Sequence, residues 1–333
     1  MTSSILFTTP LGLLRRCRLQ SSAAGRTTLR PPQPPRVPRL RANAAAAAAV
    51  SAASVAQDAG ATAVVMGGAF SLVLLFDTLT DRKLIEQSLS RKVVHVLSGL
   101  LFLASWPFFS SSPQARYFAA VVPLFNCMRL ISYGLCLVTD EGLVKSITRE
   151  GKPEELLRGP LYYVLVLTFC VLVFWRDSPV GILVLAMMSG GDGFADIVGR
   201  RYGMLKLPYN RQKSWVGSIS MFIFGFLSSV GMLYYYSAMG YLYLDLENAV
   251  GKVALVSLVA TMVESLPITE TIDDNISVPV STILMAMYVF WSCTTSLKSR
   301  VLIVLLLILL MVQLVELLFN LSEICSQNVL NCC

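Results

Sequence analysis

Long stretches without a charged side chain are the feature that most constrains this chain. A helix that crosses the hydrocarbon core of a bilayer needs about 20 mostly apolar residues. Seven stretches approach or exceed that length without an Asp, Glu, Lys or Arg. Of all 333 residues, 55% are hydrophobic and 14% charged, which is outside the usual range of a soluble domain. The seven stretches are 59–76, 93–115, 159–175, 178–191, 214–244, 275–297 and 301–315.

Two further apolar stretches, 117–139 and 249–267, are interrupted by charged residues such as Arg129 and Glu264. Lipid offers no hydrogen bonds to the backbone, and these runs are long rather than short and alternating, which favours helices over a β-barrel. The sequence therefore predicts an all-α fold, a polytopic transmembrane helical bundle with about 7–9 spans. No charged, mixed stretch between the spans is long enough to form a separate soluble domain.

The N-terminal residues differ in composition from everything that follows. Residues 1–57 contain eight of the 27 Lys and Arg residues, all of them Arg, and no acid, which leaves 19 basic against 20 acidic residues beyond. Arg-rich, acid-poor leaders are typical of organelle transit peptides. We expect 1–57 to be a disordered chloroplast transit peptide, with a mitochondrial leader as the alternative, and the protein to be a multi-pass chloroplast membrane protein. Because the remainder is nearly neutral, no nucleic-acid partner is expected.

Charged residues of the body gather in two clusters at the edges of apolar runs. Arg200, Arg201, Lys206, Arg211 and Lys213 form a basic loop directly after Asp192 and Asp196, and Glu264, Glu270, Asp273 and Asp274 follow in "ESLPITETIDDNISVP". Carboxylates hold Mg²⁺, and cations with backbone N–H groups hold phosphate oxygens. The pattern predicts a site for a metal-bound polyphosphate. The alternative for the basic loop is that it only orients the protein in the membrane.

The stretch "SGGDGFADIVGRRYG" (189–203) carries the first of these clusters. If 192–203 is helical, Asp192, Asp196, Gly199 and Gly203 share one face, so both carboxylates point the same way beside a strip without side chains. The preceding "SGGDG" is expected to be flexible, with exposed N–H groups that bind an anion. Downstream, "KSWVGS" places Lys213 at the start of the next span as a phosphate clamp. His95, the one histidine, is expected to be a hydrogen-bonded interfacial residue rather than a general base.

Five blocks along the chain resemble the phytol kinase group of the polyprenol kinase family, which includes farnesol kinase and is related to dolichol kinase. The blocks are "RGPLYYV" (158–164), "SGGDGFADIVGRRYG" (189–203), "KLPYNRQKSWVGS" (206–218), "ESLPI" (264–268) and "DDNISVP" (273–279). The resemblance covers about 60–290, so we expect a kinase domain over 58–290. Residues 291–333 match nothing in the family and are expected to be an extra hydrophobic segment.

The resemblance implies a polytopic membrane kinase that transfers a phosphoryl group from CTP to the terminal hydroxyl of an isoprenoid alcohol. Phytol is the expected acceptor, with geranylgeraniol and farnesol as alternatives, and the product would feed tocopherol synthesis and salvage of chlorophyll phytol. Asp192 and Asp196 are the expected ligands of Mg²⁺, and one of them accepts the alcohol proton. Lys213 is expected to neutralise charge, and Glu264, Asp273 and Asp274 to add metal contacts. The expected nucleotide-binding residues are Gly199, Arg200, Arg201, Gly203, Lys213, Ser214 and Gly217.

Two other functions compete with a kinase. A CDP-diacylglycerol synthase type cytidylyltransferase also binds CTP, but its glycine- and aspartate-rich terminal signature is replaced here by "DDNISVP". A membrane transporter would explain spans with charged residues, but the sequence shows no inverted repeat of hydropathy, and acids beside a basic loop suit a nucleotide better than an ion path. The sequence does not fix the preferred alcohol or the base of the nucleotide.

Overall fold

The computed structural model describes residues 38–138, 148, 152–267 and 273–290, together with 305–306, 308–310, 312–313 and 315–320, and side chains from residue 49 onward. These residues form helices and contain no strand, so the predicted all-α fold is confirmed. The α-helices are α1 (Pro38–Asp81), α2 (Gln87–Ser105), α3 (Ala115–Gly134), α5 (Gly159–Val173), α6 (Pro179–Ala186), α7 (Gly193–Tyr202), α8 (Trp215–Ala238), α9 (Leu246–Ser265) and α10 (Asp274–Phe290). Short helical segments are η1 (Trp106–Phe108), η2 (Pro153–Leu157) and η3 (Met187–Asp192).

The chain divides into two compact units, Met1–Ala46 and Ala47–Cys333. In the first unit the structure describes only residues 38–46, which are helical. Helix α1 thus begins inside the predicted leader, because its first turns contain a run of alanines, the strongest helix former. The first 37 residues of that leader, and most of the predicted extra segment 291–333, lie outside the described residues.

Five helices among the described residues are long and apolar enough to cross a membrane. They are Ala49–Asp81, Pro153–Val173, Pro179–Tyr202, Trp215–Ala238 and Glu247–Ser265, and the shorter Asp274–Phe290 is also apolar. Their burial differs sharply: 83% of the most apolar window of Pro179–Tyr202 is buried, against 6% for Ala49–Asp81. The former is therefore the central helix of the bundle, and the latter a peripheral one.

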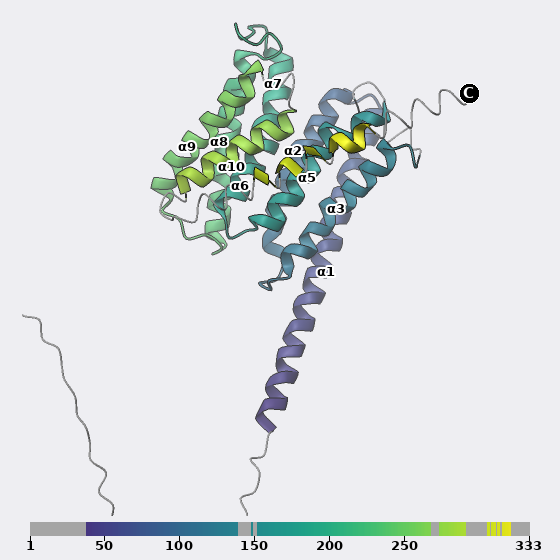
Figure 1. The fold of residues 1–333 in the computed structure, drawn as a ribbon, viewed down its shortest axis with the longest axis vertical. Coiled ribbons are helices and arrows are strands. Elements are labelled where there is room, and N and C mark those ends of the chain that lie inside the picture. The colour runs from purple at the N-terminus through teal and green to yellow at the C-terminus, as the bar shows by residue number, and fades with distance from the viewer. Residues whose placement is uncertain are drawn as a thin grey trace, which may run out of the picture. The chain divides into compact units, whose positions relative to one another are not determined.

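The second unit packs its helices around this central stretch. Helices α6, α8, α9 and α10 pack against one another, α3 packs on α5, and α7 continues the line of α6 beside α8 (Figure 1). Ser214 and Asp245 begin α8 and α9, since their side chains accept hydrogen bonds from the N–H groups of Gly217 and Glu247. The core is filled by large side chains such as Trp106 and Tyr236.

The central helix corrects one prediction. The stretch "SGGDG" was expected to be a flexible segment with exposed N–H groups, but α6, η3 and α7 follow one another without a loop, and Ser189 to Gly193 are all buried. The segment η3 is a π-helical turn, a wider turn that is found mostly as an insertion in α-helices. Its glycines are required by packing, because a Cβ on Gly190 would lie 2.5 Å from Ser228 Oγ of α8.

Candidate active site

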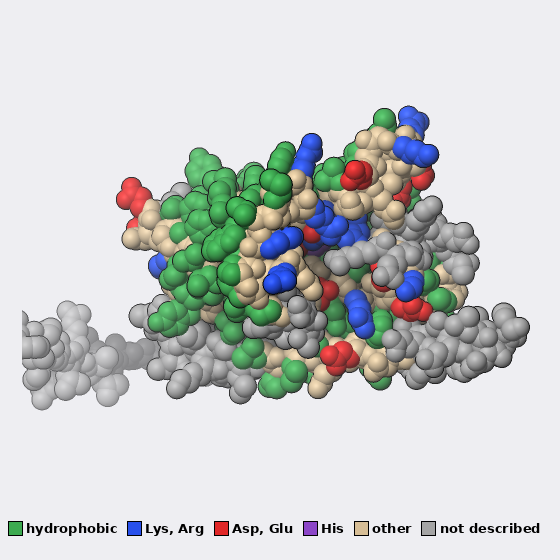
Figure 2. All heavy atoms as spheres, turned by 90° about the horizontal axis from the view of Figure 1, so that it is seen from above, with side chains coloured by type: hydrophobic (Ala, Val, Ile, Leu, Met, Phe, Trp, Pro, Cys, Tyr) green, Lys and Arg blue, Asp and Glu red, His purple; other side chains and the backbone are tan. Residues whose placement is uncertain are grey.

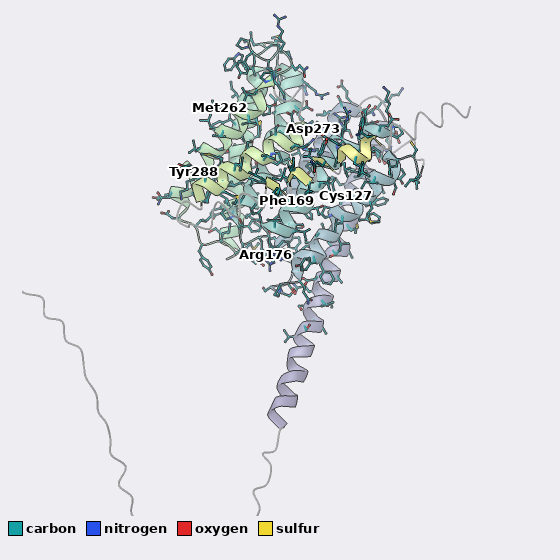
Figure 3. The ribbon with its side chains drawn as sticks, viewed as in Figure 1. Cys127, Phe169, Arg176, Met262, Asp273 and Tyr288 are labelled. Atoms are coloured by element: carbon teal, nitrogen blue, oxygen red, sulfur yellow. The ribbon has the colours of Figure 1, made fainter. Side chains whose placement is uncertain are left out.

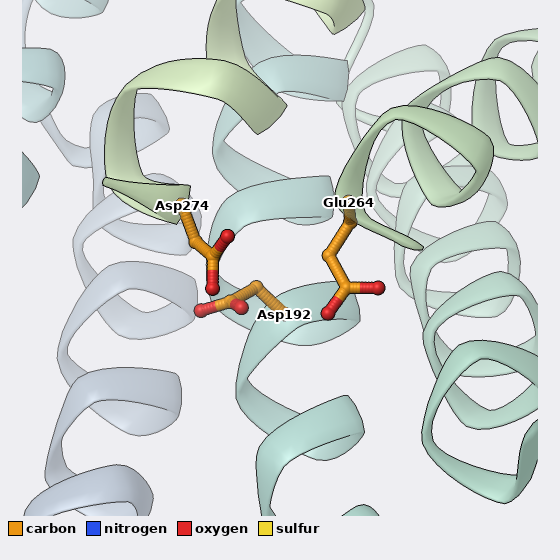
Figure 4. Close-up of side chains that lie close together, drawn as sticks. All are labelled: Asp192, Glu264 and Asp274. Carbon is orange, nitrogen blue, oxygen red and sulfur yellow. The ribbon is translucent and has the colours of Figure 1, made fainter. Parts of the chain in front are cut away.

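Three acidic side chains from three helices meet at one end of the bundle. Asp192 lies at the junction of η3 and α7, Glu264 in the last turn of α9, and Asp274 at the first residue of α10. One carboxylate oxygen from each lies within 4.8 Å of the other two, and Figure 4 shows the three groups pointing toward one another. Asp192 and Glu264 are buried, at 4% and 3% exposure. Three carboxylates brought together out of water need cations to offset their repulsion.

Two lysines supply such cations from other segments. Lys213 Nζ donates to Glu264 Oε1 and, at 2.8 Å, to Asp274 Oδ2. Lys92 Nζ, on α2, lies 3.2 Å from Asp192 Oδ2 and 3.7 Å from Asp196 Oδ2. Burial alone would lower the pKa of Lys213, but the Glu264 and Asp274 carboxylates outweigh it and hold that pKa above its ordinary value. Lys213 is therefore charged at neutral pH.

Asp196 lies one helical turn beyond Asp192 and is held differently. Its Oδ1 accepts a 2.7 Å bond from Arg200 Nε, and its Oδ2 has no hydrogen-bond partner among the described residues. Because Lys92 reaches both aspartates, the two carboxylates point the same way, as the helical spacing indicated. The structure thus brings Asp192 together with Glu264 and Asp274, and places Asp196 beside them rather than among them.

His95 also lies next to this group. Its Nε2 is 3.9 Å from Asp192 Oδ2 and 3.3 Å from the carbonyl oxygen of Met188, and its ring lies 4.0 Å from that of Tyr163, centroid to centroid. The Tyr163 hydroxyl in turn donates to the carbonyl oxygen of His95. These contacts fit the hydrogen-bonded role expected from the sequence, at the edge of the carboxylate group.

The loop between α7 and α8 carries Lys213 and is fixed to the end of α9. Asn210 is buried, and its Nδ2 donates to the carbonyl oxygens of Ser265 and Leu266, at 3.1 and 3.3 Å. An isolated antiparallel bridge between Lys206 and Ser214 closes the loop. Since Ser265 follows Glu264 directly, these bonds hold Lys213 against Glu264.

The four carboxylates, the two lysines and Arg200 line one polar cavity with about 580 Å³ of empty space, part of it open to solvent, whereas His95 and Asn210 lie outside its lining. Figure 2 shows basic side chains gathered around a hollow on the face viewed from above, with acidic side chains among them. A cavity lined by both signs of charge suits a small polar ligand. Its lining consists of Lys92, Asp192, Ala195, Asp196, Gly199, Arg200, Lys206, Gln212, Lys213, Ser214, Gly217, Ser218, Glu264 and Asp274.

The glycines of the site have a packing role that the sequence did not indicate. A Cβ on Gly199 would lie 3.3 Å from Gly217 Cα, so the two glycines let α7 and α8 approach closely beneath the cavity. Gly203 ends α7, and a Cβ there would lie 2.1 Å from the Gly199 carbonyl oxygen. Gly199 and Gly217 still line the cavity, whereas Gly203 does not.

Nine of the predicted site residues line the cavity and three do not. Arg201 is exposed and lies over the ring of Tyr202, and Gly203 closes the helix. Asp273 accepts hydrogen bonds from the backbone and side-chain nitrogens of Asn275, at 2.9 and 2.8 Å, and so caps α10. The nine are Asp192, Asp196, Gly199, Arg200, Lys213, Ser214, Gly217, Glu264 and Asp274.

Sequence reasoning missed Lys92, Ala195, Gln212 and Ser218 as cavity residues, and placed Lys206 in the basic loop without a role of its own. For Lys92 the available signal was a lysine at the start of an apolar run in "SRKVVH", a costly place for a charge without a partner. Its partners lie 100 residues or more further along the chain. No local pattern in the sequence could have paired them.

The donor set suits a hard divalent cation. Carboxylate oxygens are the preferred ligands of Mg²⁺, which binds them at about 2.1 Å, so two oxygens on opposite sides of the ion lie about 4.2 Å apart. The 4.8 Å spread of Asp192, Glu264 and Asp274 is close to that separation. Glu264 Oε2 and Asp274 Oδ1 also lack hydrogen-bond partners within the described part of the chain. The residues present therefore fit a bound metal ion.

The fold and the site define a class of protein: a helical membrane bundle with a polar cavity lined by carboxylates and lysines. The sequence is 67% identical over 239 residues to "Probable phytol kinase, chloroplastic" of Zea mays, covering 72% of this chain and 79% of that protein. It is 61% identical over 229 residues to "Phytol kinase 1, chloroplastic" of Arabidopsis thaliana, covering 69% and 75%. No protein-family model and no solved structure matches it. The chain belongs to the phytol kinase family.

A more distant relative is also named a phytol kinase. "Probable phytol kinase 2, chloroplastic" of Oryza sativa subsp. japonica is 44% identical over 235 residues, 71% of this chain and 77% of that protein. The family resemblance inferred from the five sequence blocks is therefore confirmed, and with it the class of enzyme, a kinase with an alcohol acceptor.

Proposed function

We propose that this chain is a CTP-dependent phytol kinase of a chloroplast membrane, which converts phytol to phytyl phosphate. The observation that supports it most is that Asp192, Glu264 and Asp274, with Lys92 and Lys213, line one polar cavity in a member of the phytol kinase family. The relatives' names include the word chloroplastic, and five described helices are able to span a membrane. The product would feed tocopherol synthesis and salvage of chlorophyll phytol.

The carboxylates and cations divide the work of phosphoryl transfer between them. A bound Mg²⁺, held by Asp192, Glu264 and Asp274, would neutralise charge on the β- and γ-phosphates. Lys213 and Arg200, which line the same cavity, would bind phosphate oxygens. Asp196, whose Oδ2 is without a hydrogen-bond partner among the described residues, accepts the proton of the alcohol. The alcohol oxygen then bonds to the γ-phosphorus as the bond to the β–γ bridging oxygen breaks, and CDP leaves.

The acceptor's hydrocarbon chain needs an apolar site that opens near this cavity. A second pocket, narrow and apolar, lies between α5 and α10 and is lined by Tyr162, Val166, Phe169, Ile276, Pro279, Val280, Ile283, Ile308 and Val312. The first turn of α10 contributes to both spaces, since Asp274 lines the polar cavity and Ile276 the apolar pocket. We assign the isoprenoid chain to this pocket.

One assay separates the three candidate functions. Purified protein is incubated with phytol, Mg²⁺ and CTP labelled either in the γ-phosphate or in the cytidine. A phytol kinase places the γ-label in the lipid phase, a cytidylyltransferase places the cytidine label there, and a transporter places neither. Replacing CTP with ATP, GTP or UTP, and phytol with geranylgeraniol or farnesol, then identifies the donor and the acceptor. Absence of γ-label in the lipid for every pair would refute the proposal.

A further inference from the structure

Two lysines of the cavity each lie between two carboxylates. Lys213 Nζ contacts both Glu264 and Asp274, and Lys92 Nζ lies within 4 Å of both Asp192 and Asp196. These contacts join segments far apart in the sequence, since the partners are 51–104 positions away. The two ammonium groups, with Arg200 at Asp196, are therefore the cations that hold the four carboxylates together.

The ammonium groups pair with only some of the carboxylate oxygens. Glu264 is 97% buried, yet its Oε2 has no hydrogen-bond partner in the described ranges, and neither has Asp274 Oδ1 or Asp196 Oδ2. Buried polar atoms are nearly always paired, so unpaired oxygens on residues that line a cavity are consistent with a ligand site. The site is thus built to accept more positive charge than the lysines deliver.

A divalent ion competes with the lysines for the same oxygens. Mg²⁺ carries two charges and binds oxygen at about 2.1 Å, closer than an ammonium nitrogen at about 2.8 Å. An ammonium and a metal ion on the same carboxylates repel each other across a short distance with little water between them. A bound metal ion therefore displaces the lysine side chains, which remain charged and are long enough to turn into the cavity.

The charge balance shows where the displaced lysines go. The cavity lining contains four carboxylates, Asp192, Asp196, Glu264 and Asp274, and four cations, Lys92, Lys206, Lys213 and Arg200. Their formal charges cancel, and one divalent ion leaves the site with two positive charges. A site with this net charge, and with two free ammonium groups, attracts a triphosphate.

We propose that Lys92 and Lys213 are exchangeable counter-cations: without metal they pair with the carboxylates that would bind it, and on metal binding they move to the phosphates of the nucleotide. The exchange with metal stands by itself, whereas the second step rests on the proposed kinase function. Lys92 thereby becomes a nucleotide-binding residue contributed by α2, a helix outside the aspartate and lysine motifs.

The test uses the purified full-length protein and Mn²⁺ as the probe for the metal. Mn²⁺ affinity is measured by electron paramagnetic resonance without nucleotide, and the affinity for a non-hydrolysable CTP analogue is measured with saturating Mn²⁺. In Lys213→Met and Lys92→Met, Mn²⁺ binding is expected to tighten about tenfold because a competitor is gone, while the analogue binds at least about tenfold more weakly. These opposite signs distinguish exchange from a merely structural role, which would weaken both.

Two further variants act as matched controls. Lys206 lines the same cavity without an ion pair to any described carboxylate, so Lys206→Met should weaken analogue binding and leave Mn²⁺ affinity unchanged. Lys213→Arg keeps the charge between Glu264 and Asp274, so its Mn²⁺ affinity should not rise. Unchanged or weaker Mn²⁺ binding in both Lys→Met variants would overturn the proposal, as would an equal rise in Lys213→Arg.

A measurement on the unmodified protein covers the case in which the Met variants fail to fold. Reaction of Lys92 and Lys213 with an amine-specific reagent, followed by mass spectrometry, should become faster with Mn²⁺ alone and slow again when the nucleotide analogue is added. Reactivity that is indifferent to Mn²⁺ would contradict the exchange. If Mn²⁺ exposes the lysines but no nucleotide protects them, the exchange stands and the proposed kinase function fails.

Discussion

Two regions of this bundle bury charged side chains, and they treat them in opposite ways. In the first, Asp58 is fully buried and accepts hydrogen bonds from the backbone nitrogen and the hydroxyl of Ser110, at 2.6 and 2.8 Å. Arg176 donates to the carbonyl oxygens of Trp106, Phe109 and Ser110, at 3.2, 2.9 and 2.6 Å. Neither residue lines either of the two pockets described above. Figure 3 places Arg176 away from Asp273, which marks the end of the bundle with the acidic cluster.

In the second region the charges face a cavity and are incompletely paired. Glu264, Asp274 and Asp196 each keep one oxygen without a hydrogen-bond partner in the described structure, and all three line the polar cavity. This difference in pairing distinguishes charges that hold the fold together from charges that bind a ligand. Charges that are fully satisfied by backbone and hydroxyl groups fix one segment to another, whereas charges left short of partners beside open space are arranged for a ligand.

The largest expected effect comes from neutralising one carboxylate of the acidic cluster. Asp192→Asn should lower phytol kinase activity by about 10²–10³-fold, because it removes a charge that acts on the transferring phosphate. Its melting temperature should fall only slightly, since Lys92 loses one ion pair but keeps Asp196 as a partner. Kinase activity and thermal unfolding, both measured in the same detergent, test the two parts of this prediction. If the variant kept full activity, or lost activity only because it unfolds, Asp192 would have a structural role like that of Asp58 and Arg176.

The reverse outcome is expected at the other region. Arg176→Met leaves three carbonyl oxygens without their donor in a buried place, and should destabilise the fold by about 3 kcal/mol. Activity per folded molecule should stay within about threefold of the unmodified protein, because this variant leaves the polar cavity unchanged. Denaturation measured by near-UV circular dichroism, with activity corrected for the folded fraction, provides the test. A large loss of activity in fully folded protein would break the comparison.

The sequence predicted the membrane bundle and most of the cavity because charges are rare in so apolar a chain. Six of the nine residues are charged and could be chosen for that reason, since a charge at the edge of an apolar run costs free energy unless it has a purpose. Gly199, Ser214 and Gly217 were expected from the family resemblance instead. The sequence could not predict which charges meet. Lys92 pairs with aspartates of a different helix, and only the packing of α2 against η3 and α7 brings them together.

Two local errors have definite physical causes. The "SGGDG" segment resembles a loop because glycine is a poor helix former, but contacts with α8 that only glycine permits keep it helical. Asp273 and Asp274 are adjacent acids and cannot be told apart by type or position. The start of α10 decides between them, because the residue just before the helix turns its carboxylate back to the backbone, and the next one points into the cavity.

A substitution in the apolar pocket is expected to have an intermediate effect on kinase activity. Val280→Phe adds bulk to the wall of the pocket between α5 and α10, and should raise KM for phytol about tenfold. KM for the nucleotide should not change, because Val280 does not line the polar cavity. Steady-state kinetics with each substrate varied in turn measure the two values. Two outcomes would contradict the assignment of the isoprenoid chain to this pocket. One is a rise in the KM for the nucleotide alone, and the other is equal KM values for phytol and a short alcohol in the unmodified protein.

The smallest effect separates two neighbouring acids, and it tests the comparison at its finest scale. Asp273 is satisfied by Asn275 at the start of α10, so Asp273→Asn should cost at most about 1 kcal/mol of stability and change activity less than about threefold. Asp274→Asn removes a cavity carboxylate that Lys213 holds at 2.8 Å, and should lower activity at least about 10²-fold without a comparable loss of stability. The two variants have the same amino-acid composition and differ only in which of two adjacent positions is changed. A difference in activity between them therefore reports on the position and not on the type of substitution. Equal losses of activity in both would mean that an unpaired oxygen facing the cavity does not mark a ligand site here, and a larger loss for Asp273→Asn would transfer the metal role to the capping residue.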